Sequence, residues 1–176
     1  MLKKLLLTLI IALPLAIATS AQEPASEDAK TRPNKQEVLD LMIKAGRMPA
    51  QQQNARIDAI WKDSSAGKTP RSDFLFCTGF AYLGNPKAQQ CVGSAYENGR
   101  GIVEDLSEAY AWYAVALENK LTDKATAEKI EADKERVKER LLSAYPHPTE
   151  DDLDDLAKAQ ESRIAQYQED VKKAKR

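Results

Sequence analysis

The sequence has few of the residues that build metal centres, and neither sign of charge dominates. It contains one histidine and two cysteines in 176 residues, whereas a structural zinc site takes four nitrogen or sulfur ligands. Its 26 Lys and Arg residues nearly balance its 27 Asp and Glu residues, whereas nucleic-acid binding usually requires a basic face. We therefore expect no metal, no cofactor and no nucleic-acid partner.

The long hydrophobic run of the chain lies at its N-terminus. Lys3 and Lys4 precede the apolar stretch Leu5–Ala18, and small residues follow at positions 19–21. This order predicts a secretory signal peptide over residues 1–21, with cleavage after residue 20 or 21. The run is shorter than the roughly 20 apolar residues of a membrane-spanning helix and contains Pro14. We expect no stable membrane span after cleavage; an uncleaved anchor helix is the alternative.

The leader also predicts where the protein is located. Its short basic start and Leu- and Ala-rich body resemble Gram-negative export signals, so we expect a periplasmic protein. Removing residues 1–21 leaves 24 basic and 27 acidic residues, and a formal net charge of −3 suits a soluble protein. Residues 22–34 are polar, contain two prolines and have no large apolar residue, which predicts a flexible linker.

From residue 35 onward the pattern indicates helices and almost no strands, so we expect an all-α fold. Residues 35–45 have apolar positions at three- and four-residue spacing and end at Gly46. Capping residues and prolines predict the other helices. These are one from Pro49 to about residue 65, one with Thr69 as N-cap and Pro70 at its first position to about residue 83, one from Pro86 to Asn98, one from Asp105 to Asn119, one from Thr122 to Tyr145, and one after a Thr149–Asp152 capping box.

Residues 121–176 are thereby predicted to form a long C-terminal helix pair. The last helix carries a seam at alternating spacings of three and four, formed by Ala157, Gln160, Ile164, Tyr167, Val171 and Ala174. A coiled coil needs three or four good heptads, so we interpret the seam as packing on the preceding helix. A homo-oligomer assembled through this helix is the alternative.

Two short segments of the chain repeat each other. Residues 77–82 and 91–96 share the pattern Cys-x-Gly-x-Ala-Tyr at a shift of 14, with a turn at Gly84–Pro86 between them. The pattern predicts two antiparallel helices that turn similar faces toward each other. Gly79 and Gly93 would then allow a close approach of the two backbones.

Residues 88–119 resemble a Sel-1-like repeat, a branch of the tetratricopeptide-like helical repeats. Ten positions fall in register with the family pattern: Ala88, Gly93, Tyr96, Gly99, Gly101, Asp105, Ala109, Trp112, Tyr113 and Ala116. A partial repeat precedes it, with Phe76 in the position of the family tryptophan, whereas Leu117 and Lys120 depart from the pattern. The resemblance implies a short right-handed solenoid over residues 35–120, in which these ten residues are structural.

The resemblance also implies a function, because Sel-1-like proteins are typically adaptors. We expect a periplasmic protein–protein interaction adaptor without catalytic activity, whose concave surface binds an unidentified protein of the cell envelope. β-Lactam binding or weak hydrolysis, as in cysteine-rich members of the family, is the alternative. The Ser65–Lys68 motif lacks the companion motifs of penicillin-recognising enzymes. His147, between two prolines, has no evident nucleophile to activate.

The two cysteines lie at matching positions of the predicted hairpin. Cys77 and Cys91 are each seven residues from Gly84, and equidistant positions of an antiparallel hairpin face each other. In an exported protein this arrangement predicts a disulfide; two reduced core thiols are the alternative. Closing a loop of about 15 residues would stabilise the fold by roughly 3 kcal/mol.

We predict that the mature protein is two hydrogen masses lighter before reduction than after it, because the Cys77–Cys91 bond adds two hydrogens when it is reduced. Intact-mass spectrometry under non-reducing and reducing conditions measures the difference. Two alkylatable thiols in the native exported protein would contradict the prediction.

Overall fold

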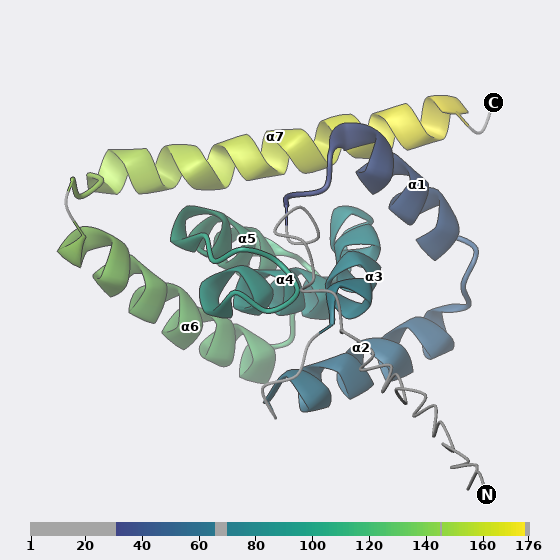
Figure 1. The fold of residues 1–176 in the computed structure, drawn as a ribbon, viewed down its shortest axis with the longest axis horizontal. Helices are drawn as coiled ribbons and strands as arrows, with labels where there is room; N and C mark the ends of the chain where they lie inside the picture. The colour runs from purple at the N-terminus through teal and green to yellow at the C-terminus, as the bar shows by residue number, and fades with distance from the viewer. Residues whose placement is uncertain (1–30, 66–69, 145, 175–176) are drawn as a thin grey trace, which may run out of the picture.

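The computed structural model describes residues 31–65, 70–144 and 146–174, which form seven α-helices and contain no strand (Figure 1). The all-α class is therefore confirmed. In chain order the helices are α1 (Lys35–Ala45), α2 (Ala50–Ser65), α3 (Arg71–Tyr82), α4 (Pro86–Asn98), α5 (Leu106–Glu118), α6 (Lys124–Ser143) and α7 (Glu150–Ala174). The expected signal peptide and most of the expected linker lie outside the described residues. None of the described helices is long and apolar enough to cross a membrane.

Several helix starts coincide with the capping residues that the sequence indicates. The side chains of Asn85 and Asp105 each accept a hydrogen bond from the backbone N–H three residues later. Asn34, which the sequence predicts to be part of the linker, caps α1 in the same way. Thr149 and Asp152 form the expected reciprocal pair at the start of α7. Each such cap satisfies a backbone donor that has no partner within the helix, which is worth about 1 kcal/mol.

Two helix starts and one helix end differ from the positions that the sequence predicts. Asp123, not Thr122, caps α6, because the Thr122 hydroxyl instead donates to the backbone oxygen of Ala116. Pro70 is the N-cap of α3 rather than its first residue, and Thr69 lies outside the described residues. Helix α6 ends at Ser143, before the expected Tyr145, because Ala144 already has an extended backbone.

The core is centred on α3, α4 and α5. Helix α1 packs on α3, α2 lies against α4, and α6 covers α5, while α7 runs across α5, α3 and α1 (Figure 1). The largest fully buried side chains include Trp112 and Tyr113 of α5 and Phe74 and Phe80 of α3. Helices α6 and α7 therefore supply outer cover for the α4–α5 hairpin that precedes them.

The seam of α7 does pack within the chain, but not on the preceding helix. Gln160, Ile164 and Val171 are buried, and the main contacts of α7 are with α5, α3 and α1. The stripe of α6, formed by Ile130, Val137 and Leu141, is already buried where α6 covers α5. Because the apolar stripe of α6 is already buried against α5, α7 does not pack along α6. It diverges from α6 and covers the core on the side of α5, α3 and α1 (Figure 1).

The sequence pattern predicts that Gly79 and Gly93 face each other across α3 and α4. This prediction is wrong, because each glycine contacts a different helix. A Cβ atom at Gly79 would lie 2.8 Å from the carbonyl oxygen of Leu41, in α1. A Cβ atom at Gly93 would lie 2.8 Å from a ring carbon of Tyr113, in α5. The two glycines thus admit different neighbours, α1 beside α3 and α5 beside α4.

A buried carboxylate joins α4, α5 and α6. Glu97 accepts hydrogen bonds from Arg136 Nε at 2.8 Å, from Arg136 Nη2 at 2.9 Å and from the Tyr113 hydroxyl at 2.8 Å. Burial by itself raises the pKa of Glu97, but the bonds from Arg136 and Tyr113 outweigh it, so that the pKa lies below its ordinary value. The carboxylate therefore stays ionised at neutral pH.

We predict that Glu97→Gln lowers the free energy of unfolding by about 1–3 kcal/mol at pH 7, because Arg136 loses its buried charged acceptor. The pKa of Glu97 is lower in the folded state than in the unfolded state. Its contribution is therefore present above about pH 4.3, the ordinary value for glutamate, and disappears as the pH falls through the folded-state pKa. The variant should lack this part of the acid sensitivity, as measured by urea unfolding at pH 7 and below pH 4.

The matched control is Glu131→Gln, which removes a half-exposed carboxylate of α6 that pairs with Lys134 three residues away. Such a pair contributes at most about 0.5 kcal/mol. Equal losses in the two variants, or equal acid sensitivity of Glu97→Gln and wild type, would contradict the role of Glu97.

Candidate functional site

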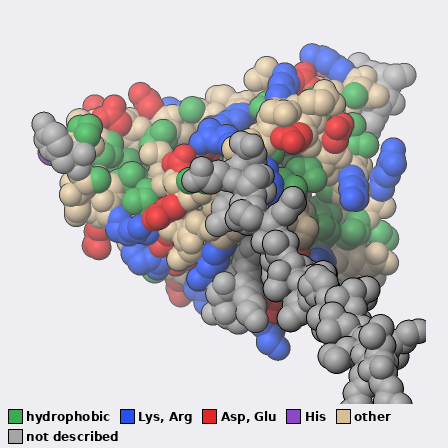
Figure 2. Space-filling model, in the orientation of Figure 1, with side chains coloured by type: hydrophobic (Ala, Val, Ile, Leu, Met, Phe, Trp, Pro, Cys, Tyr) green, Lys and Arg blue, Asp and Glu red, His purple; other side chains and the backbone are tan. Residues whose placement is uncertain are grey.

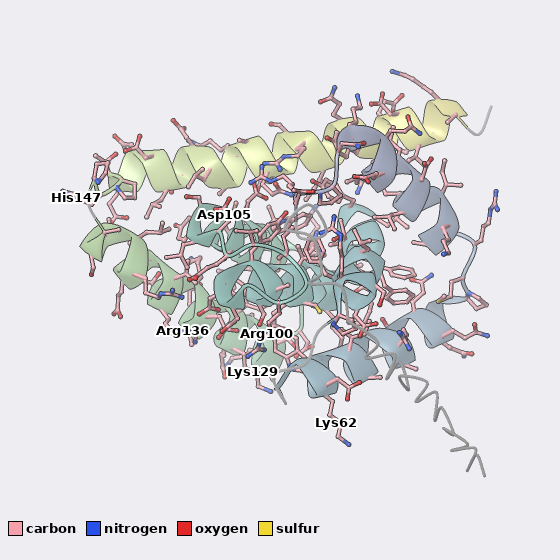
Figure 3. All side chains as sticks on the ribbon, viewed as in Figure 1. Lys62, Arg100, Asp105, Lys129, Arg136 and His147 are labelled. Carbon is pink, nitrogen blue, oxygen red and sulfur yellow. The ribbon has the colours of Figure 1, made fainter. Side chains whose placement is uncertain are left out.

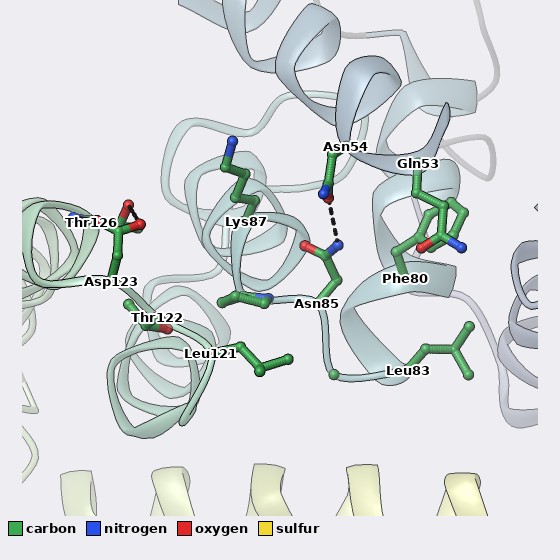
Figure 4. Close-up of a pocket in the computed structure, with 12 residues that line it drawn as sticks. Gln53, Asn54, Phe80, Leu83, Asn85, Lys87, Leu121, Thr122, Asp123 and Thr126 are labelled. Atoms are coloured by element: carbon green, nitrogen blue, oxygen red, sulfur yellow. Dashed lines mark hydrogen bonds between the residues drawn. The ribbon is translucent and has the colours of Figure 1, made fainter. Parts of the chain in front are cut away.

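Two adjoining hollows form a groove between α2, the start of α4 and the start of α6. Their volumes are about 370 and 220 Å³, and both are lined by Lys87 and Thr126. Figure 4 shows the larger hollow, with Asn54 of α2 and Asn85 before α4 on one side and Leu121 and Thr126 on another. Trp61 lines the smaller hollow. We call this continuous surface the α2–α4–α6 groove.

Polar contacts hold α2 beside α4 along this groove. Lys87 Nζ lies 2.8 Å from Asp58 Oδ1, and Asn85 Nδ2 donates to Asn54 Oδ1 at 3.1 Å (Figure 4). Both partners of the ion pair are about half exposed, and an exposed pair of this kind contributes only about 0–1 kcal/mol. Its groups can therefore change partner at little cost when a ligand enters.

Asn119 positions the connection from α5 to α6, which forms the opposite wall. Its Nδ2 atom donates to the backbone oxygen of Gly84 and to Gln89 Oε1, both at 2.9 Å. Its Oδ1 atom accepts from the backbone N–H of Leu121 at 3.0 Å. The Asn119 side chain thereby links the α5–α6 connection to the α3–α4 turn at Gly84 and to α4 at Gln89.

Leu121 is the most exposed of the large hydrophobic side chains that the structure describes, at 76% of its full accessible area. It lines the larger hollow together with Phe80 and Leu83, and its side chain extends into the hollow (Figure 4). Asn119 holds its backbone in place, so the leucine is presented to solvent by a fixed structure. This arrangement offers an apolar contact to a ligand.

The polar lining of the groove is rich in carboxamides and hydroxyls. Gln53, Asn54, Asn85 and Gln90 contribute amides, while Thr122 and Thr126 contribute hydroxyls. The charged residues of the lining, Asp58, Asp123, Lys87 and Lys129, are two of each sign. No group of His, Cys, Asp and Glu within the described ranges could hold a metal ion. The lining suits a ligand with amide-like donors and acceptors rather than one of strong charge.

The ten repeat positions lie elsewhere, in the packing of the hairpin. Ala88, Ala109, Tyr113 and Ala116 are fully buried, and Asp105 caps α5. Gly99 and Gly101 have the left-handed φ angles of 62° and 71° that a sharp turn requires. The remaining three are in tight contacts: Gly93 against Tyr113, Tyr96 edge-on to Phe74, and Trp112 edge-on to Tyr82.

The cysteines do face each other across α3 and α4. Their sulfur atoms lie 3.0 Å apart as two buried thiols. The hydrogen bond to Cys91, together with burial, raises the pKa of the Cys77 thiol. A thiol held protonated in this way is a poor nucleophile. The Cys77–Cys91 disulfide stays a prediction.

Of the motifs considered for catalysis, the described part of the structure places only His147. The Ser65–Lys68 motif falls largely outside the described residues. His147 lies in the connection between α6 and α7, at the end of the molecule away from α2 (Figure 3). Sequence reasoning missed Asn119 and Leu121, although the departure from the repeat pattern at Leu117 and Lys120 indicated where the regular structure ends.

Comparisons with protein-family models, with curated proteins and with solved structures find no match to this chain.

We predict that Asn119→Ala lowers the free energy of unfolding by about 1–3 kcal/mol, because the Gln89 amide oxygen is buried and loses its donor. Urea unfolding monitored by circular dichroism measures the loss. The control Asn98→Ala removes an exposed amide that donates within α4 and should change stability by no more than about 0.5 kcal/mol. A similar small effect at both positions would show that Asn119 does not hold the wall of the groove.

Proposed function

We propose that this protein is an adaptor of the cell envelope, a short Sel-1-like solenoid that is exported to the periplasm and binds a segment of a partner protein. The observation that carries the proposal is the fixed, exposed Leu121 beside a polar groove. The ten matching positions of residues 88–119 supply the reason to interpret the helices as repeats. Repeat arrays bind partners along the surface formed by successive helices.

The helix packing is compatible with a solenoid. Helices α4 and α5 form one antiparallel hairpin, α3 packs on α4, and α1 packs on α3. One complete repeat is fewer than the three that such arrays usually need for stability. Helices α6 and α7 would then act as caps, because they cover the faces of α5 and α3 that a further repeat would otherwise bury.

The occupant that the groove fits best is an extended, weakly charged peptide with an apolar side chain. Such a segment exposes one N–H and one C=O per residue, which the carboxamides of Asn54, Asn85 and Gln90 can pair with. Its apolar side chain would pack between Leu121 and Leu83. The balanced charges of the lining give no general attraction for a strongly acidic or basic ligand.

The two alternatives find less support in the described helices. An oligomer formed through the α7 seam would need side chains that α7 already buries inside the chain. β-Lactam hydrolysis would need an activated nucleophile, and the hydroxyls of the groove are engaged in local structure. Thr122 donates to the backbone oxygen of Ala116, and Thr126 donates to Asp123, the N-cap of α6. We therefore propose binding without catalysis.

We predict that Leu121→Ser weakens binding of selected peptides at least tenfold, because it removes the exposed apolar contact. Peptides would be selected by display on the immobilised mature protein and measured by isothermal titration. Val103→Ser is the matched control, since Val103 is also exposed, at 60%, but does not line the groove. Peptides that bind wild type and Leu121→Ser equally well would contradict the groove as the binding surface.

A photo-crosslinking residue at position 121, with the same residue at position 103 as control, tests the proposal in the cell. We expect a defined adduct in the periplasmic fraction only from position 121, and its purified partner should repeat the effect of Leu121→Ser. The same adducts from both positions would contradict the proposal. Recovery of this protein in the cytoplasmic fraction would contradict it as well.

A further inference from the structure

A second cavity lies beneath α7 and is separate from the α2–α4–α6 groove. Its volume is about 290 Å³, enough for about ten water molecules at roughly 30 Å³ each. Four aromatic residues contribute to its lining, together with two arginines and a threonine: Tyr82, Tyr96, Trp112, Tyr167, Arg32, Arg163 and Thr78. They come from α3, α4, α5, α7 and the segment before α1, so the cavity exists only in the folded chain.

The charges at this cavity cancel. Arg163 Nη2 and Arg32 Nη2 lie 3.1 and 3.0 Å from the same oxygen of Glu108, and Arg32 also pairs with Asp105 at 3.1 Å. Two guanidinium groups thus face two carboxylates. Both arginines of the lining are therefore already neutralised by carboxylates. The cavity gives an anion little net attraction, whereas a neutral ligand can still accept hydrogen bonds from the guanidinium groups.

Two polar groups near this cluster have capacity for further hydrogen bonds. The hydroxyl of Tyr96 makes no hydrogen bond to any residue described; although the residue as a whole is only 5% exposed, this oxygen is not one of the fully buried unpaired atoms, so it is open to the cavity that Tyr96 lines. Gln160, one turn before Arg163 on α7, is fully buried, and neither its amide nitrogen nor its amide oxygen has a partner in the described structure. Buried polar groups of folded proteins are normally paired, so each such exception needs a physical reason.

The aromatic rings provide the apolar part of the site. Tyr82 stacks on Tyr167 with ring centres 5.1 Å apart and meets Trp112 edge-on at the same distance. Small-molecule sites typically combine apolar and aromatic walls with a few placed polar groups. At the mouth, the Arg32 side chain is half exposed, so it can move aside without unpacking the core.

We propose that this cavity binds a small, uncharged, polyhydroxylated molecule of about the size of a monosaccharide. Its C–H faces pack against Trp112 and the tyrosine rings. Its hydroxyls accept from Arg163 and share a hydrogen bond with the hydroxyl of Tyr96, both of which line the cavity. Each of these groups is both directional and fixed by neighbouring helices, so the site favours hydroxyls over an apolar ligand of the same size.

The two tryptophans of the chain separate this proposal from the groove, because Trp112 lines the cavity and Trp61 lines the groove. In a Trp61→Phe background, fluorescence reports on Trp112 alone. Titration with glucose and with N-acetylglucosamine should change this fluorescence, with a dissociation constant in the millimolar range or below. The Leu121→Ser variant, which alters the groove and not the cavity, should show the same change in Trp112 fluorescence on adding sugar.

Tyr96→Phe removes only the hydroxyl and should weaken sugar binding at least fivefold, while circular dichroism shows an unchanged fold. Tyr110→Phe is the matched control, because Tyr110 is also a buried tyrosine of the core but does not line the cavity. No response of Trp112 to either sugar at about 10 mM, a concentration well above a millimolar dissociation constant, would overturn the proposal. A response that Tyr96→Phe leaves unchanged would overturn it as well.

Discussion

The packing of Tyr113 on the backbone at Gly93 sets the spacing on which much of the fold depends. The aromatic ring occupies the space that a side chain at position 93 would need, so α4 and α5 approach closely only because residue 93 is glycine. The hydroxyl at the far end of the same ring donates to Glu97. Glu97 in turn binds Arg136 of α6. One aromatic side chain therefore links the α4–α5 hairpin to α6, the helix that covers it.

This link has consequences for the candidate groove. The groove lies between α2 and α6, so its width depends on how α6 is held relative to α4. Glu97 and Arg136 fix the middle of α6, while Asn119 fixes the connection before it. The polar contacts across the groove, by comparison, are exposed and weak. A rigid frame with an adaptable lining is what a surface needs to accept a peptide without unfolding.

Basic and acidic side chains both occur over the face of the molecule shown in Figure 2. The ion pairs that matter most to the structure are instead the partly buried ones, at Glu97 and at Glu108. Glu108 holds α7 through Arg163 and the segment before α1 through Arg32. The two carboxylates thus attach the outer elements of the chain to α4 and α5. Both occupy helix faces of the hairpin, and both pair with arginine, whose planar guanidinium group matches a carboxylate.

Helix positions and several of their caps could be predicted from the sequence, because both depend on residues close together in the chain. Asn85 before Pro86, Asp105 before α5 and the Thr149–Asp152 pair are local hydrogen-bonding signals that distant residues do not alter. The facing of Cys77 and Cys91 also followed from local geometry, since both lie equally far from one turn. The partner of each helix face could not be predicted in this way. Gly79 admits α1 and Gly93 admits α5, although the two segments share one sequence pattern.

The candidate sites show the same division between local and distant information. The sequence determined where the seven helices between residues 35 and 174 lie and that small residues allow α4 and α5 to pack closely. Only the tertiary structure decided that α7 crosses α5, α3 and α1, that Leu121 stands in a groove and that Tyr96, Trp112 and Arg163 surround one cavity. The physical reason is that capping and helix periodicity act over a few residues. Burial, by contrast, depends on which of several similar apolar stripes is already covered by another helix.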